Sequence, residues 1–167
     1  MTNSKLEISL LNANVKAFLE MIRHSEGTAV PEGYRMMFGG KLFSVPDNNN
    51  WPDHPHIFFS YKNKAGQVIK TSAAGAYQIT WTTWIALKVK LGLKDFSPRS
   101  QDLAACDLLT EAGAMSLIIC GNFVQAIDKV RKTWASLPGS GCHQPEHKLA
   151  EVEKWYEDAG GNMLAAA

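Results

Sequence analysis

An apolar stripe at helical spacing stands out near the N-terminus. Apolar residues recur there every three or four positions, which predicts an amphipathic helix over residues 12–27 that ends at Gly27. The stripe consists of Val15, Phe18, Leu19 and Ile22. Four residues further along, the same face reaches Glu26, so a carboxylate is expected at the inward edge of the helix end.

After this helix, glycine, proline and asparagine interrupt the apolar pattern, as is typical of short strands joined by loops. Segments 34–38 and 41–43 flank Gly39-Gly40, a dipeptide that tolerates the positive φ angles of a tight turn, and they predict a β-hairpin. Two further strands are predicted at 58–61 and 67–71, around a turn at 64–66.

The segment 46–55, which reads PDNNNWPDHP, contains three prolines. Each proline removes a backbone donor, so the segment cannot form a regular ladder. We predict a long exposed loop that carries Trp51, Asp53 and His54.

From residue 74 onward the apolar spacing predicts helices. Tyr77 and Gln78 are expected to open the first of them, with their side chains projecting from its first turn. The predicted helices run to Gly92, from Ser97-Pro98 to Gly113, and over 115–119, 123–134 and 145–159.

This order of elements predicts an α+β fold in which a small β-hairpin lobe, about residues 30–72, is inserted between an N-terminal helix and a helical lobe. A single domain over 1–164 is expected from the chain length. Residues 165–167 are three alanines that could be native or vector-derived, and they carry no functional argument.

Composition and charge narrow the possible functions. Apolar residues make up 46% of the 167 residues and charged residues 20%, which indicates a globular rather than a disordered chain. Seventeen basic and sixteen acidic residues give a net charge of +1, without a cluster of Lys and Arg. Nucleic acid is therefore not an expected partner.

The cysteines and the N-terminus bear on the compartment. Cys106, Cys120 and Cys142 are odd in number and widely spaced, which argues against a disulfide framework and indicates a reducing compartment. No basic start is followed by a continuous apolar run, so no export signal is expected. No stretch reaches the roughly eighteen apolar residues that span a bilayer, so stable membrane insertion is not expected either.

Glu26 is the residue with the clearest chemical potential. At the inward edge of a helix C-terminus, the negative end of the macrodipole and the apolar neighbours both favour the protonated carboxyl. A carboxyl held protonated near neutral pH can donate a proton to a leaving glycosidic oxygen. The alternative is a solvated glutamate at a fraying helix end.

Several sequence blocks keep a family's order and spacing from about residue 15 to residue 161. They are SEGT at 25–28, FGGKLF at 38–43, DHP at 53–55, AGAYQ at 74–78, LGLKDFSPRSQD at 91–102, QAID at 125–128, WASLPGSG at 134–141 and EHK at 146–148. These blocks resemble the bacteriophage lambda endolysin family, which are lytic transglycosylases of peptidoglycan.

The resemblance implies a lysozyme-like α+β fold with the substrate cleft between two lobes. It also implies that Glu26, in the SEG motif, is the catalytic acid and that Tyr77 and Gln78 line the cleft beside it. The further candidates for substrate binding are Ser25, Trp51, His54 and His147. For Trp51, stacking on a sugar and anchoring of the loop are both open, whereas for His147 a structural hydrogen bond is favoured over sugar contact.

The sequence departs from the lambda protein at three of these places. Glu32, Ala76 and Cys142 stand where the lambda protein has His, Arg and Tyr, respectively. These changes bear on local sugar contacts and on the pH response, and they leave the acid in place.

A hydrolytic glycosidase normally needs a second carboxylate. Glu32 and Asp53 are the candidates, although both lie in loop sequence where a solvated charge is the ordinary explanation. We therefore favour a mechanism with one carboxylate, in which Glu26 protonates the bridging oxygen and then accepts the proton of the muramoyl C6 hydroxyl.

No cofactor and no metal are expected. His54 and His56 flank a proline, and Cys142, His143 and His147 cluster, but neither set has the spacing of a strong metal motif. No phosphate-binding loop and no Ser-His-Asp pattern are recognisable.

The resemblance predicts a phage endolysin that cleaves the bond between N-acetylmuramic acid and N-acetylglucosamine and leaves a 1,6-anhydro product. The alternatives are a hydrolytic muramidase of the same fold and a glycan-binding module without chemistry. A monomer is expected, held in the host cytoplasm until holin-dependent release and then acting on peptidoglycan strands in the periplasm.

Overall fold

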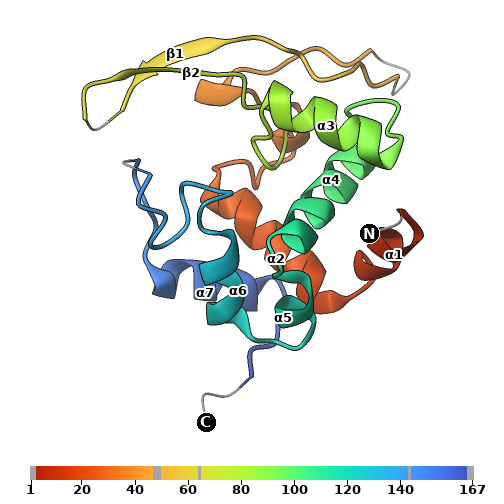
Figure 1. The fold of residues 1–167 in the computed structure, drawn as a ribbon, viewed down its shortest axis with the longest axis vertical. Helices are drawn as coiled ribbons and strands as arrows, with labels where there is room; N and C mark the ends of the chain where they lie inside the picture. Colours follow the sequence, from red (N-terminus) through yellow and green to blue (C-terminus); the bar gives the residue numbers. More distant parts are fainter. Residues whose placement is uncertain (1–2, 47–49, 64, 143, 165–167) are drawn as a thin grey trace.

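Helices and one short β-hairpin make up the regular structure of the computed structural model, which describes residues 3–46, 50–63, 65–142 and 144–164 (Figure 1). In chain order the main elements are α1 (Asn3–Ser9), α2 (Ala13–Ser25), β1 (Phe59–Lys62), β2 (Val68–Thr71), α3 (Trp81–Leu91), α4 (Pro98–Glu111), α5 (Met115–Ile119), α6 (Phe123–Val130) and α7 (Leu149–Asp158). Four parts of the sequence discussed above lie outside the described residues. They are the tail 165–167, Lys64 of the predicted turn, His143 of the Cys/His cluster and part of the proline-rich loop.

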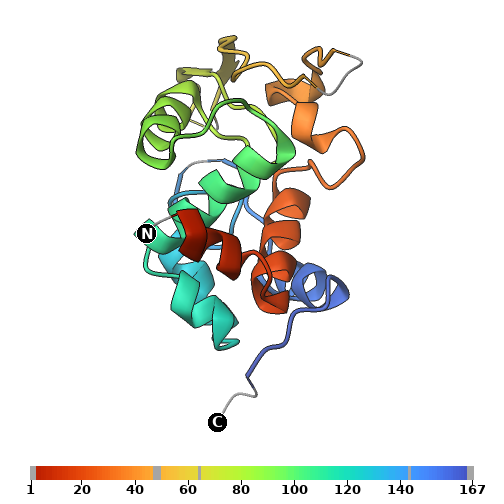
Figure 2. The same ribbon diagram turned by 90° about the vertical axis from the view of Figure 1, so that its right-hand side faces the viewer.

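The elements gather in two groups joined by α4. β1, β2 and α3 form one group, α1, α2, α5, α6 and α7 form the other, and α4 runs from one to the other in both views (Figures 1 and 2). This is the predicted α+β arrangement, with a small β region between an N-terminal helix and a helical lobe. None of the helices that the structure describes has the length and apolar content required to cross a bilayer.

The predicted helix at 12–27 is confirmed as α2. Asn12 is its N-cap and accepts a hydrogen bond from the backbone N–H of Val15. All four residues of the apolar stripe are buried, and they contact a core that includes α7. At the other end Gly27 has a φ of 70°, which turns the chain away from the helix. The short helix α1, which precedes α2, was not predicted.

The start of α3 differs from the prediction. Tyr77 and Gln78 precede the helix, whose N-cap is Thr80 and whose left-handed C-cap is Gly92. Gly75 and Gln78 both have positive φ angles, 78° and 47°, which are incompatible with a helical turn. These two residues therefore bound a tight turn, closed by hydrogen bonds between Ala74 and Ile79.

The β region is partly as predicted. β1 and β2 pair as an antiparallel hairpin in which Phe59 lies opposite Thr71. The strands predicted at 34–38 and 41–43 do not form, because 3₁₀ turns at Gly33–Arg35 and Phe38–Gly40 occupy most of this stretch. The chain does reverse around Gly39-Gly40, where an antiparallel bridge joins Met36 to Leu42. The N–H of Phe38 binds the carbonyl of Ala73 instead.

The connection between α6 and α7 is longer than predicted. α6 ends at Val130 and α7 begins at Leu149, so the described residues between them, 131–142 and 144–148, are irregular and are termed the 131–148 segment below. The Glu146 carboxylate organises it by accepting hydrogen bonds from the N–H groups of Gly139 and Gly141 and from the Ser140 hydroxyl, each 2.9 Å long. These hydrogen bonds within the segment give its backbone an alternative to helix.

Candidate active site

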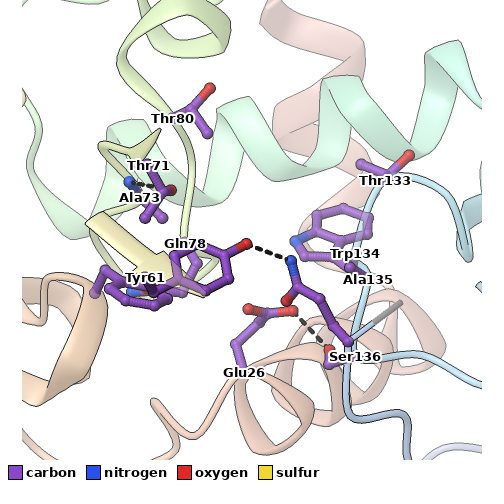
Figure 3. A pocket seen from close by; sticks show the side chains of 12 residues that line it. Glu26, Tyr61, Thr71, Ala73, Gln78, Thr80, Thr133, Trp134, Ala135 and Ser136 are labelled. Carbon is purple, nitrogen blue, oxygen red and sulfur yellow. Dashed lines mark hydrogen bonds between the residues drawn. The ribbon is translucent and has the colours of Figure 1, made fainter. Parts of the chain in front are cut away.

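Glu26 is the C-cap residue of α2 and borders a cavity of about 210 Å³ (Figure 3). Most of the polar side chains that line the cavity are neutral hydrogen-bonding groups, as suits a sugar ligand. They are Tyr61, Thr71, Gln78, Thr80, Thr133 and Gln144, together with Ser136. They come from β1, β2, the turn before α3 and the 131–148 segment, so the cavity lies where the two groups of elements meet.

Ser136 holds the Glu26 carboxyl in place. Its hydroxyl donates a hydrogen bond of 2.6 Å to Oε1 of Glu26 (Figure 3). The Ser25 hydroxyl oxygen lies 2.5 Å from that of Ser136, and it donates in this arrangement because the single Ser136 proton is directed at Glu26. Oε2 of Glu26 has no hydrogen-bond partner among the described residues. One carboxyl oxygen is thus fixed and the other remains available.

Burial raises the pKa of Glu26 above its usual range, while the hydrogen bond from Ser136 acts in the opposite direction and is the smaller effect. This is the direction of shift predicted from the place of Glu26 at the apolar edge of α2. The carboxyl therefore stays protonated to higher pH than an ordinary glutamate.

The described lining contains no other carboxylic acid. Asp53 is engaged elsewhere: its carboxylate accepts from the Trp84 indole at 2.7 Å and forms an ion pair with Lys88. Hydrogen bonds from Lys88, Trp84 and the His54 N–H lower the pKa of Asp53 despite partial burial, which acts to raise it. Glu32 is exposed beside the 3₁₀ turn at Gly33–Arg35. Neither lines the cavity with Glu26.

The Tyr-Gln pair divides between the cavity and the core. Gln78 lines the cavity, and its amide donates to the carbonyls of Met36 and Gly75. Tyr77 does not line this cavity, but it borders a second pocket that shares Gln78, Thr80, Thr133 and Trp134 with it. Only 2% of Tyr77 is exposed, because its phenol points away and donates to Asp102 at 2.7 Å.

Neither Ser25 nor His147 lines the cavity that contains Glu26. Ser25 is buried and acts on the acid through Ser136. The Nε2 of His147 lies 3.2 Å from the Ser25 carbonyl, and its ring packs edge-on against Trp155. This geometry is that of a structural hydrogen bond, the role favoured for His147 from the sequence.

The described residues 50–55 are irregular and partly exposed, as predicted, but His54 itself is buried. His54 is 4% exposed, its Nε2 lies 2.9 Å from the Ile79 carbonyl, and its ring packs against Phe96. Burial, the largest cause, lowers the pKa of His54. Trp51 is half-buried and packs edge-on against Phe43. Both residues anchor the loop, and neither lines the cavity that contains Glu26.

Several lining residues were not singled out from the sequence. Tyr61 of β1 accepts a hydrogen bond of 2.8 Å from the Gln144 amide, which links the hairpin to the 131–148 segment. Ser136 and Trp134 belong to the WASLPGSG block, whose match was the one available signal.

Among the described residues, no group of three His, Cys, Asp or Glu side chains is arranged to hold a metal ion.

Comparison with known proteins places the chain in a family. The family model described as Endolysin matches residues 16–163. The endolysin of Escherichia phage lambda is 39% identical over 159 residues, which cover 92% of this chain and 95% of that protein. The endolysin of Escherichia phage P2 is 36% identical over 156 residues, 89% and 93% of the two chains.

Solved structures give the same relationship. Bacteriophage lambda lysozyme in complex with a chitohexasaccharide superposes with a TM-score of 0.81 at 38% identity, covering 92% of this chain and 97% of that one. A second structure, lysozyme from bacteriophage lambda, gives a TM-score of 0.78 with the same identity and coverage. The fold is therefore lysozyme-like, and this chain belongs to the endolysin family.

Proposed function

We propose that this chain is a phage endolysin that cleaves the β-1,4 bond between N-acetylmuramic acid and N-acetylglucosamine in peptidoglycan by lytic transglycosylation. Family membership and the chitohexasaccharide bound to the lambda relative support an enzyme acting on a glycan. The observation that favours transglycosylation is the single carboxylic acid, Glu26, among the described residues that line the cavity.

In this mechanism Glu26 begins as the acid. The carboxyl proton passes to the bridging glycosidic oxygen, the bond to the muramoyl C1 breaks, and an oxocarbenium-like centre develops. The departing sugar carries the proton away as a hydroxyl, and Glu26 is left as a carboxylate. Ser136 then stabilises the negative charge through its hydrogen bond to Oε1.

The second half returns the proton. The C6 hydroxyl of the same muramoyl residue attacks C1, and Glu26 accepts the C6 hydroxyl proton, which restores the starting enzyme. Because the attacking oxygen belongs to the substrate, the reaction is unimolecular and needs no positioned water. A hydrolase would instead use a second carboxylate as nucleophile about 5 Å away or as base about 6.5–9.5 Å away.

Product analysis tests this proposal. Purified peptidoglycan is digested with the enzyme, and the released muropeptides are analysed by mass spectrometry. Transglycosylation yields 1,6-anhydromuramic ends, which are lighter by one water than the reducing ends left by hydrolysis. Reducing ends from the first time points onward would refute transglycosylation and favour a hydrolytic muramidase.

The same proposal covers partners and place of action. The partner is the glycan strand, and the chain acts as a monomer after holin-dependent release from the host cytoplasm to the periplasm. Clearing of permeabilised Gram-negative cells separates an enzyme from a non-catalytic binding module, because a module that only binds glycan leaves the turbidity unchanged.

A further inference from the structure

The turn from Gly75 to Gln78 has an unfavourable backbone conformation. Gln78 has a φ of 47°, a region that residues with a side chain rarely adopt. Such a conformation persists only when the surrounding structure holds it. Since Gln78 lines the cavity, the groups that hold this turn also determine where its amide lies.

Gln101 on α4 holds the first half of the turn. Its side chain is fully buried, and Oε1 accepts a hydrogen bond of 2.8 Å from the N–H of Ala76. Its amide nitrogen donates to the carbonyls of Phe96 and Tyr34, so the side chain cannot rotate without losing three bonds. A Cβ at Gly75 would lie 2.2 Å from Oε1 of Gln101, which shows how closely the turn fits this side chain.

Asp102, the next residue of α4, holds the second half. Its Oδ1 accepts hydrogen bonds from the phenols of Tyr77, at 2.7 Å, and Tyr34, at 2.8 Å. The carbonyl of Tyr77 in turn accepts from the Trp134 indole at 3.0 Å, and Trp134 is part of the cavity wall. The turn is thus attached both to α4 and to the 131–148 segment.

We propose that Gln101 and Asp102 are positioning residues for glycan binding, an inference that rests on the proposed function. Neither side chain lines the cavity with Glu26. They act through the turn: Gln101 fixes Ala76, Asp102 fixes Tyr77, and together they maintain the left-handed backbone that presents Gln78 to the glycan. This assigns a role to the Gln-Asp pair that ends the LGLKDFSPRSQD block.

A matched pair of variants separates positioning from general stabilisation. Tyr77→Phe and Tyr34→Phe each remove one phenol that donates to Oδ1 of Asp102, but only Tyr77 belongs to the turn. Both variants are expected to lower Tm to a similar extent. Affinity for chitohexaose is measured by calorimetry in a Glu26→Gln background, and kcat and KM are measured on soluble glycan strands in the wild-type background.

Tyr77→Phe is expected to weaken chitohexaose binding about tenfold and to raise KM accordingly with a smaller change in kcat, because misplacement of Gln78 affects binding first. Asp102→Asn should show the same change in Kd, whereas Tyr34→Phe should stay within about twofold of the parent. Equal losses of affinity for the two tyrosine variants would show that the network only stabilises the fold, and would overturn the proposal. The tyrosine pair decides the matter even if Asp102→Asn does not fold.

The binding measurement also keeps this inference separate from the proposed function. Reducing ends in the wild-type products would refute transglycosylation while leaving the difference between the tyrosine variants intact. Conversely, anhydro products together with equal affinities would retain the proposed function and reject the positioning role.

Discussion

Ser136 and Glu26 are 110 positions apart in the sequence and are joined by a hydrogen bond of 2.6 Å. The bond connects the end of α2 to the 131–148 segment, so the orientation of the carboxyl depends on residues that are distant in sequence. Because the bond favours the ionised carboxyl while burial favours the protonated one, Ser136 tunes the pKa of Glu26 as well as its position.

Glu26→Gln is expected to reduce the rate of lysis by roughly 10²- to 10⁴-fold, because the amide keeps the volume of the side chain but cannot transfer a proton. Turbidity of permeabilised cells measures the loss, and circular dichroism checks the fold. Clearing at close to the wild-type rate would mean that another residue is the acid.

Glu26→Gln should also change the dependence of stability on pH. A carboxyl whose pKa is raised by folding binds its proton more tightly in the folded state, so wild-type stability declines as pH rises from the unfolded pKa, about 4.3, through the raised folded pKa. Gln does not ionise. The Tm of the variant relative to the wild type should therefore increase with pH across this window, and thermal unfolding at a series of pH values measures it.

Ser136→Ala is expected to move the alkaline limb of the pH–activity profile to higher pH. The variant loses the bond that lowers the pKa of Glu26, so the carboxyl remains protonated further into the neutral range. The plateau rate should fall roughly tenfold, because the carboxyl is no longer held. Ser136→Thr, which retains a hydroxyl, serves as the control and should restore both features. A limb that moves to lower pH would contradict this account.

Asp53→Asn and Glu32→Gln should each slow turnover by no more than about tenfold, equal to about 1.4 kcal/mol, since neither carboxylate lines the cavity with Glu26. Asp53→Asn should lower Tm near neutral pH, because its ion pair with Lys88 and its bond to Trp84 are weakened. The pKa of Asp53 is depressed by folding, so its stabilisation is present above the unfolded pKa, about 3.9, and is lost as pH falls through the folded pKa. A rate loss of several orders of magnitude in either variant would revive the two-carboxylate mechanism.

Thiol-blocking reagents and chelators are expected to leave activity largely intact. Cys106 is buried, and Cys120 and Cys142 are exposed but do not line the cavity with Glu26. Lysis is measured after iodoacetamide treatment and, separately, after EDTA treatment. Cys142→Ser is the control, because Cys142 is close in sequence to Gln144, which lines the cavity. Activity lost with EDTA and restored by zinc would assign a metal role to the Cys and His residues.

The parts of the fold that the sequence predicted depend on local signals. Asn12 and Ser97 cap helices by accepting from N–H groups three residues ahead, and Gly92 ends α3 in a left-handed conformation. Each signal acts within one helical turn, so it can be recognised without knowledge of the rest of the chain.

The parts that were missed depend on partners distant in sequence. The burial of His54 depends on Ile79 and Phe96, and the phenol of Tyr77 points into the core because Asp102 accepts its hydrogen bond. The pairing of Ser136 with Glu26 is of the same kind. No spacing within a window of the chain encodes these contacts, so the match of Tyr77 to the family motif did not indicate where its phenol points.

The distance in sequence between Glu26 and its partners has a consequence for biosynthesis. Glu26 emerges from the ribosome well before Ser136, His147 and α7, which packs along α2. A nascent or prematurely terminated chain therefore contains Glu26 but lacks both the Ser136 hydroxyl, which orients the carboxyl, and α7, which packs against α2. Fragments that end before α7 should therefore be inert toward the cell wall, and lytic capacity should accumulate only with chains that extend through α7.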